Sequence, residues 1–218
     1  MIDFEQARVN MVESQIRVND VTDHDIIRAF SKVPRERFVP SDKRALAYMD
    51  EDIAISDDGR FLMEVRSLSK MLQLAEVDAE DIVLDIGCGT GYSTAILARL
   101  CTSVVALESD EALAQQASET LMDLGVDNAV VVQGPLEKGH AKEGPYDVIL
   151  IGGAVENMPL ALGDQLKEGG RLVVVEGTGN AGRARIFLKR GKTFSGRDAF
   201  NSAVQLLPGF EKKPEFIF

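Results

Sequence analysis

The sequence has few of the residues from which metal sites and disulfide frameworks are built. Its 218 residues include two cysteines, Cys88 and Cys101, and two histidines, His24 and His140. Two cysteines without a CxxC spacing exclude a disulfide framework and are typical of reduced thiols in a cytoplasmic protein. The histidines lie far apart in sequence, so the sequence favours neither a zinc site nor a Ser-His-Asp triad. We therefore expect a cytoplasmic protein without a bound metal.

Basic residues are also in short supply. Lys and Arg number 24 against 35 Asp and Glu, which gives a net charge of −11. An acidic surface repels phosphate backbones, so nucleic acid is not an expected partner. No apolar run approaches the roughly 20 residues of a membrane span. The opening residues, MIDFEQARVN, lack the apolar stretch of a secretory signal. We expect no membrane partner, and the sequence leaves a monomer and a homodimer equally open.

From about residue 81 onward, short apolar runs alternate with helical patterns. The apolar runs predict strands over 81–87, 102–108, 128–134, 146–153 and 171–177. Helices are predicted between them over 91–100, 109–125 and 158–170, the second with Ser109 as its N-cap. Continuous apolar strands separated by helices indicate an α/β fold with a mostly parallel sheet covered on both faces.

The two ends of the chain differ from this central part. Helical patterns over 4–17, 22–33 and 65–77 predict a helical N-terminal cap, residues 1–80, that serves as the substrate region. Residues 81–218 form the predicted binding domain, in one compact unit with the cap. After residue 183 we expect a strand or hairpin over 184–194. The segments SAVQLLP and PEFIF then close the sheet edge as antiparallel strands.

Residues 83–97, VLDIGCGTGYSTAIL, place three glycines at alternate positions between a predicted strand and a predicted helix. Glycine permits positive φ and close approach of a ligand to the main chain, as in nucleotide sites at helix N-termini. The dinucleotide fingerprint GxGxxG needs glycine where Tyr92 stands, which disfavours an NAD-dependent oxidoreductase. Glu108 ends the next strand, where a carboxylate accepts hydrogen bonds from ribose hydroxyls. We expect exposed main-chain amides between Asp85 and Tyr92, facing Glu108.

Asp85 followed by GxGxG resembles motif I of the S-adenosylmethionine-dependent methyltransferases. The ordered segments MVESQIR, VPRERFVP, AYMDEDIAI, VLDIGCGTGYSTAILARL and PYDVILIGGAVENMP resemble the protein-L-isoaspartate O-methyltransferases up to about Glu176. The resemblance implies a Rossmann-like fold with a seven-stranded sheet, S-adenosylmethionine as cofactor, and methylation of isoaspartyl carboxylates in damaged proteins. The implied cofactor-binding residues are Asp85, Gly87, Cys88, Gly89, Gly91, Glu108 and Leu136. A carboxylate acceptor is ionised at neutral pH, so the reaction needs no general base, and no catalytic residue is assigned.

Two segments depart from the family pattern. The family motif GQTISQP, whose serine is thought to hold the acceptor carboxylate, aligns from Gly59 and places Arg60 on its glutamine and Met63 on its serine. A thioether donates no hydrogen bond. Arg60 is expected either on the surface or in a bidentate pair with a carboxylate. In the second segment, Pro135 replaces the aspartate of the family's GDG, beside Leu136. The alternatives left open are a cofactor-binding relative with a different acceptor and a catalytically silent binding module.

Overall fold

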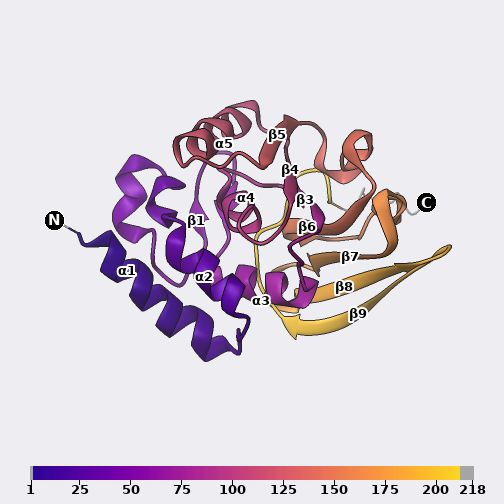
Figure 1. The fold of residues 1–218 in the computed structure, drawn as a ribbon, viewed down its shortest axis with the longest axis horizontal. Coiled ribbons are helices and arrows are strands. Elements are labelled where there is room, and N and C mark those ends of the chain that lie inside the picture. The colour runs from indigo at the N-terminus through magenta and orange to yellow at the C-terminus, as the bar shows by residue number, and fades with distance from the viewer. Residues whose placement is uncertain (1, 212–218) are drawn as a thin grey trace, which may run out of the picture.

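The computed structural model describes residues 2–211, which fold around a seven-stranded sheet (Figure 1). The strand order is β5-β4-β3-β6-β7-β8-β9. The strands are β3 (Ile82–Ile86), β4 (Ser103–Glu108), β5 (Ala129–Gln133), β6 (Tyr146–Val155), β7 (Leu166–Glu176), β8 (Arg183–Arg190) and β9 (Thr193–Asn201). The first five pair in parallel, whereas β8 and β9 are antiparallel. The predicted mostly parallel seven-stranded sheet is confirmed.

Helices and a small hairpin surround this sheet. The helices are α1 (Phe4–Met11), α2 (His24–Lys32), α3 (Val65–Ala75), α4 (Tyr92–Leu97) and α5 (Glu111–Asp123), and the hairpin consists of β1 (Ile53–Ala54) and β2 (Phe61–Leu62). In Figure 1 the N-terminal helices α1 and α2 lie on one side of the sheet, and the β8–β9 hairpin forms the opposite edge of the molecule. None of the helices in the described part of the chain is long and apolar enough to cross a membrane.

The N-cap of α5 is Asp110 and not Ser109 as predicted. The carboxylate of Asp110 accepts a hydrogen bond from the amide of Leu113 at 2.9 Å, which is the usual capping geometry. The amide and hydroxyl of Ser109 both donate to the carboxylate of Glu108, at 2.8 and 3.3 Å. The cap therefore shifts by one residue, and Glu108 acquires two donors from its own neighbour.

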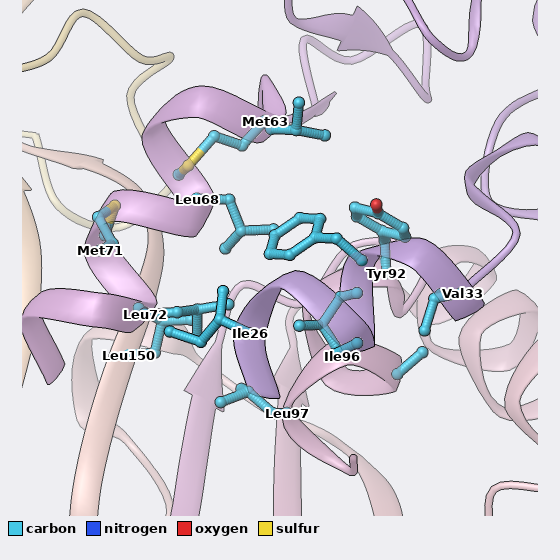
Figure 2. Close-up of a cluster of buried hydrophobic side chains, with 14 of the residues drawn as sticks. Ile26, Val33, Met63, Leu68, Met71, Leu72, Tyr92, Ile96, Leu97 and Leu150 are labelled. Atoms are coloured by element: carbon cyan, nitrogen blue, oxygen red, sulfur yellow. The ribbon is translucent and has the colours of Figure 1, made fainter. Parts of the chain in front are cut away.

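Alternation along the strands divides the core between the two faces of the sheet. One face packs against the α-helices, and Figure 2 shows Leu68 and Leu72 of α3 in one apolar cluster with Tyr92 and Ile96 of α4. The other face is covered by short 3-10 helices and the segment 204–210. The α-helix predicted over 158–170 is wrong: Leu160–Gln165 is a 3-10 helix and β7 already begins at Leu166. Gly163 packs directly on the ring of Phe194, so a Cβ atom at this position would lie 2.9 Å from the ring.

The segment after β9 does not form the expected antiparallel edge strand. Leu206 makes a single parallel bridge with Ala154 at the end of β6. The amide of Ala154 donates to the carbonyl of Gln205 at 2.8 Å, and the amide of Leu207 donates back to Ala154 at 2.9 Å. Residues 204–210 thus run along the carboxyl end of β6 in the middle of the sheet. The second predicted segment, PEFIF, lies outside the described residues.

Candidate active site

The glycine turn lies between β3 and α4, at the carboxyl edge of the sheet. The chain leaves β3 toward β4 and β5 on one side and later returns to β6 and β7 on the other, which is where open α/β sheets bind ligands. Gly87, Gly89 and Gly91 have φ of 78°, 56° and 93°. These values lie in the left-handed region, so the alternating glycines are required by the backbone of the turn.

The main-chain amides of this turn are not exposed, contrary to our expectation. The amides of Gly87 and Cys88 donate to the carbonyl of Leu107 at 2.8 and 3.3 Å, and the amide of Gly91 donates to Cys88 at 2.9 Å. The amide of Gly89 donates to a carboxylate oxygen of Glu108 at 2.8 Å. Four amides that sequence reasoning assigned to a ligand are therefore bonded within the protein.

Glu108 lies where the sequence placed it, at the end of β4 and facing the turn. Its side chain is fully buried. Besides the Gly89 amide, it accepts hydrogen bonds from the amides of Ser109 and Asp110 at 2.8 and 3.1 Å. The acidic residue and the glycine turn therefore form one connected unit.

Arg60 contacts this site directly, and the sequence did not predict Glu108 as its partner. Its two terminal nitrogens form a bidentate ion pair with the two carboxylate oxygens of Glu108, with Nη2 at 2.8 Å from Oε2. Nη2 also lies 3.4 Å from the carbonyl oxygen of Gly87. Arg60 is only 5% exposed, so the expectation of a surface arginine is wrong. The bidentate pair with a carboxylate does form, but the carboxylate belongs to the protein itself.

Apolar side chains fill the space above the glycines. A Cβ atom added to Gly87 would lie 2.9 Å from Leu207, and one added to Gly89 would lie 2.7 Å from Ile55. Two cavities of about 10 and 20 Å³ are found among these residues. Ligand pockets are usually about 300–1,000 Å³, so a nucleotide-like ligand does not fit this arrangement of side chains.

Asp85 is buried beneath the turn at the end of β3. Its Oδ2 accepts hydrogen bonds from the hydroxyls of Ser93 and Thr94, both at 2.7 Å, which ties the strand to the first turn of α4. Its Oδ1 meets no hydrogen-bond donor among the described residues. Burial is the largest influence on this carboxyl and raises its pKa from 3.8 to about 6. An ionised Asp85 is thus only partly compensated in this structure.

Replacing Asp85 with asparagine is expected to change how stability depends on pH. Because the pKa of Asp85 is raised, the folded protein binds more protons than the unfolded chain between pH 3.8 and about 6. The wild type should therefore lose about 3 kcal/mol of stability relative to Asp85→Asn as the pH rises through this window, with no further change above it. Urea unfolding at pH 4 and pH 7 measures this difference. The control is Asp127→Asn, at an exposed position. The prediction is contradicted if the stability difference between the wild type and Asp85→Asn is the same at pH 4 and pH 7.

Two other predicted site residues contribute to packing. The side chain of Cys88 lies against Ala106 and Ala117, and burial raises the pKa of its thiol well above the usual range. Leu136 is 1% exposed and packs in the core cluster that contains Leu207. The roles of both residues toward a cofactor stay predictions.

Met63, at the position of the family serine, faces the protein interior. Figure 2 shows it at the edge of the apolar cluster that contains Leu68 and Tyr92. Its carbonyl accepts a hydrogen bond from Nη2 of Arg35 at 2.8 Å. No local pattern in the sequence announces this contact, because the two residues lie 28 positions apart. The buried thioether leaves no hydrogen-bond donor at this position.

The strand order and the glycine turn after β3 define a Rossmann-like α/β protein of the kind found among methyltransferases. The profile described as Protein-L-isoaspartate(D-aspartate) O-methyltransferase (PCMT) matches residues 6–203. The chain belongs to this family and is thereby classed as an S-adenosylmethionine-dependent protein-L-isoaspartate O-methyltransferase. The predictions of family, fold, reaction class and cofactor are confirmed at this level.

Individual relatives agree with this assignment. The protein-L-isoaspartate O-methyltransferase of Opitutus terrae is 36% identical over 97% of this chain and 91% of its own length. That of a Synechococcus species is 40% identical over 80% of this chain and 71% of its own. A solved protein-L-isoaspartate O-methyltransferase superposes with a TM-score of 0.81 at 26% identity, covering 93% of this chain and 66% of that chain.

The family's cofactor does not fit the site as these side chains are arranged. Arg60 occupies both oxygens of Glu108, and Leu207 and Ile55 occupy the surface of the glycines. The chain therefore belongs to the family, but its own side chains fill the space next to the glycine turn.

Proposed function

We propose that this protein methylates isoaspartyl carboxylates of damaged proteins and that the glycine turn and Glu108 form its cofactor side. The proposed cofactor-binding residues are Asp85, Gly87, Cys88, Gly89, Gly91, Glu108 and Leu136. The main support is the hydrogen bond from the Gly89 amide to Glu108, which joins the turn and the acidic residue into one site at the carboxyl edge of the sheet. A carboxylate acceptor is already ionised at neutral pH, so the absence of a general base in this proposal costs it nothing.

The acceptor side is proposed to be a cleft of about 680 Å³ next to this site. Its walls come from the N-terminal cap and from the end of β9 with the segment after it. They carry both signs of charge: the cations are Arg66 and Lys70, and the carboxylates are Asp50, Glu51, Asp52 and Glu64. A charged, open cleft suits a peptide better than an apolar small molecule. This location supports residues 1–80 as the substrate region of a single compact unit.

The test of this function is methyl transfer from S-adenosylmethionine to an isoaspartyl peptide, with the same peptide containing ordinary aspartate as control. We expect methyl ester only on the isoaspartyl peptide. Met63→Ser should raise the rate at least about tenfold, because a hydroxyl that bonds a carboxylate stabilises by about 1.5–3 kcal/mol. If neither chain transfers a methyl group while both bind S-adenosylhomocysteine, isoaspartyl repair is the wrong reaction.

The alternative is a cofactor-binding relative without repair activity, with either another acceptor or no catalysis. Two observations favour it. Met63 offers no donor to an acceptor carboxylate, and the nearby hydroxyl of Ser67 already donates to Glu64 at 2.6 Å. Pro135 also replaces the aspartate of the family's GDG motif. Under this alternative the wild type binds S-adenosylhomocysteine but transfers no methyl group to the isoaspartyl peptide. Transfer by Met63→Ser alone favours the silent module, and transfer by neither chain favours another acceptor or none.

A further inference from the structure

Arg60 is held over the glycine turn by the β1–β2 hairpin. The carbonyl of Arg60 accepts a hydrogen bond from the amide of Ile55 at 2.9 Å, and its own amide donates to the hydroxyl of Ser56 at 3.3 Å. These two bonds join the two ends of the loop that connects β1 and β2. Ile55 faces Gly89 from the same hairpin, so one small element supplies both the arginine and an apolar cover.

The carboxylate of Glu108 has no capacity left for another pair of donors. Its Oε1 accepts from Arg60, Ser109 and Asp110, and its Oε2 accepts from Arg60 and Gly89. A carboxylate offers about four lone-pair sites in all. Ribose hydroxyls that bind Glu108 must therefore use the positions that the Arg60 guanidinium holds. The two ligands of Glu108 are mutually exclusive.

The cavities trace a closed path from the surface to the turn. The open cleft of about 680 Å³ shares Asp52 and Gln205 with the cavity of about 10 Å³ beneath the hairpin. That cavity shares Phe61, Met63 and Gly152 with the cavity of about 20 Å³ at the turn. Between the cleft and the glycines, the space is reduced to about the volume of a water molecule. The space next to the glycine turn is therefore filled by side chains of the protein.

We propose that Arg60 is an internal ligand of Glu108 that competes with the cofactor, so that cofactor binds only when the Arg60–Glu108 pair breaks and the β1–β2 hairpin moves away. This inference rests on the proposed function, because it concerns the same cofactor site. It makes Arg60 the residue that sets cofactor affinity. The free protein is then a closed form of the family fold.

The test is a calorimetric titration of S-adenosylhomocysteine into the whole chain, for the wild type and for Arg60→Gln. Gln is neutral, too short to bridge both oxygens, and is the residue of the family motif at this position. We expect Arg60→Gln to bind at least tenfold more tightly. Arg60→Lys keeps the charge but loses the fork, and should fall between the two. The control is Arg37→Gln, which removes a surface pair with Asp123 and should leave the affinity unchanged.

The outcomes separate this inference from the proposed function. Equal binding by the wild type and both Arg60 variants overturns the competition and leaves the function standing. No binding by any of the chains at millimolar ligand overturns the function and the competition together. Arg60→Lys keeps a positive charge beside Glu108. If Arg60→Gln does not fold, the affinity of Arg60→Lys for S-adenosylhomocysteine compared with the wild type decides the competition.

Hydrogen exchange provides a readout that does not depend on the variants. Ligands normally slow exchange at the elements they contact. Here S-adenosylhomocysteine should speed exchange at the Ile55 amide, because its bond to Arg60 belongs to the displaced hairpin, while slowing it at Gly89. Slower exchange at both amides contradicts displacement of the hairpin.

Discussion

Replacing Glu108 with glutamine is expected to lower the free energy of unfolding by about 3–5 kcal/mol. The reason is that the guanidinium of Arg60, whose side chain is 6% exposed, would stay buried without its counter-charge. An amide also presents an N–H₂ group to donors that Glu108 now accepts, among them the amides of Gly89 and Ser109. Urea unfolding at pH 7 measures the loss.

The double variant Arg60→Gln/Glu108→Gln is the matched control for this prediction. It removes both charges, and replacing a buried ion pair as a whole costs far less than removing one partner. We expect it to recover most of the stability lost by Glu108→Gln. If Glu108→Gln is as stable as the wild type, or if the double variant is no better, the two side chains are not the coupled pair that the structure shows.

Replacing Arg35 with alanine is expected to cost about 3–5 kcal/mol, because it combines a large cavity with two lost hydrogen bonds. Arg35 is fully buried and stacks 4.7 Å from the centre of the Tyr92 ring. Its Nε and Nη2 donate to the carbonyls of Ala47 and Met63, both at 2.8 Å. Burial lowers the pKa of this guanidinium from its usual value. The side chain connects the N-terminal cap, the β2 end of the hairpin and α4.

Thermal unfolding measures the Arg35 effect, and Arg35→Met separates its two components. Methionine fills much of the space but donates no hydrogen bond, so we expect it to cost about 1–3 kcal/mol. For a chain of this size, each kcal/mol corresponds to about 2–4 °C in melting temperature. The alanine variant should therefore melt at a temperature lower by about 6 °C or more. A loss below 1 kcal/mol for Arg35→Ala contradicts the structural role assigned to this residue.

Local patterns in the sequence predicted the sheet and the position of its ligand edge. The apolar runs at 81–87 and 102–108 became β3 and β4 because period and composition act over a few neighbouring residues. The alternating glycines predicted a turn with positive φ, and the spacing from Gly91 placed Glu108 at the next strand end. Errors in the helix and strand assignments of this region concerned boundaries, such as the N-cap at Asp110 instead of Ser109.

The 158–170 segment was predicted less well, since its fate depended on contacts outside it. Its apolar residues were compatible with a helix, but Gly163 packs against Phe194 of β9 and Leu166 pairs with Tyr146 of β6. Tertiary packing and strand pairing override a weak local preference in such a case. The same holds for residues 204–208, which lie along β6 and not at the sheet edge.

The sequence by itself determined the family, the parallel sheet, the glycine turn and the acidic residue beside it, because each of these depends on spacing within a short stretch of chain. Only the tertiary structure decided what the turn and Glu108 contact. Arg60 reaches Glu108 from 48 residues away, and Leu207 reaches Gly87 from the opposite end of the domain. A buried arginine and a buried carboxylate pair only when the folded chain brings them together, so no local pattern could reveal that the protein fills the space above its glycine turn.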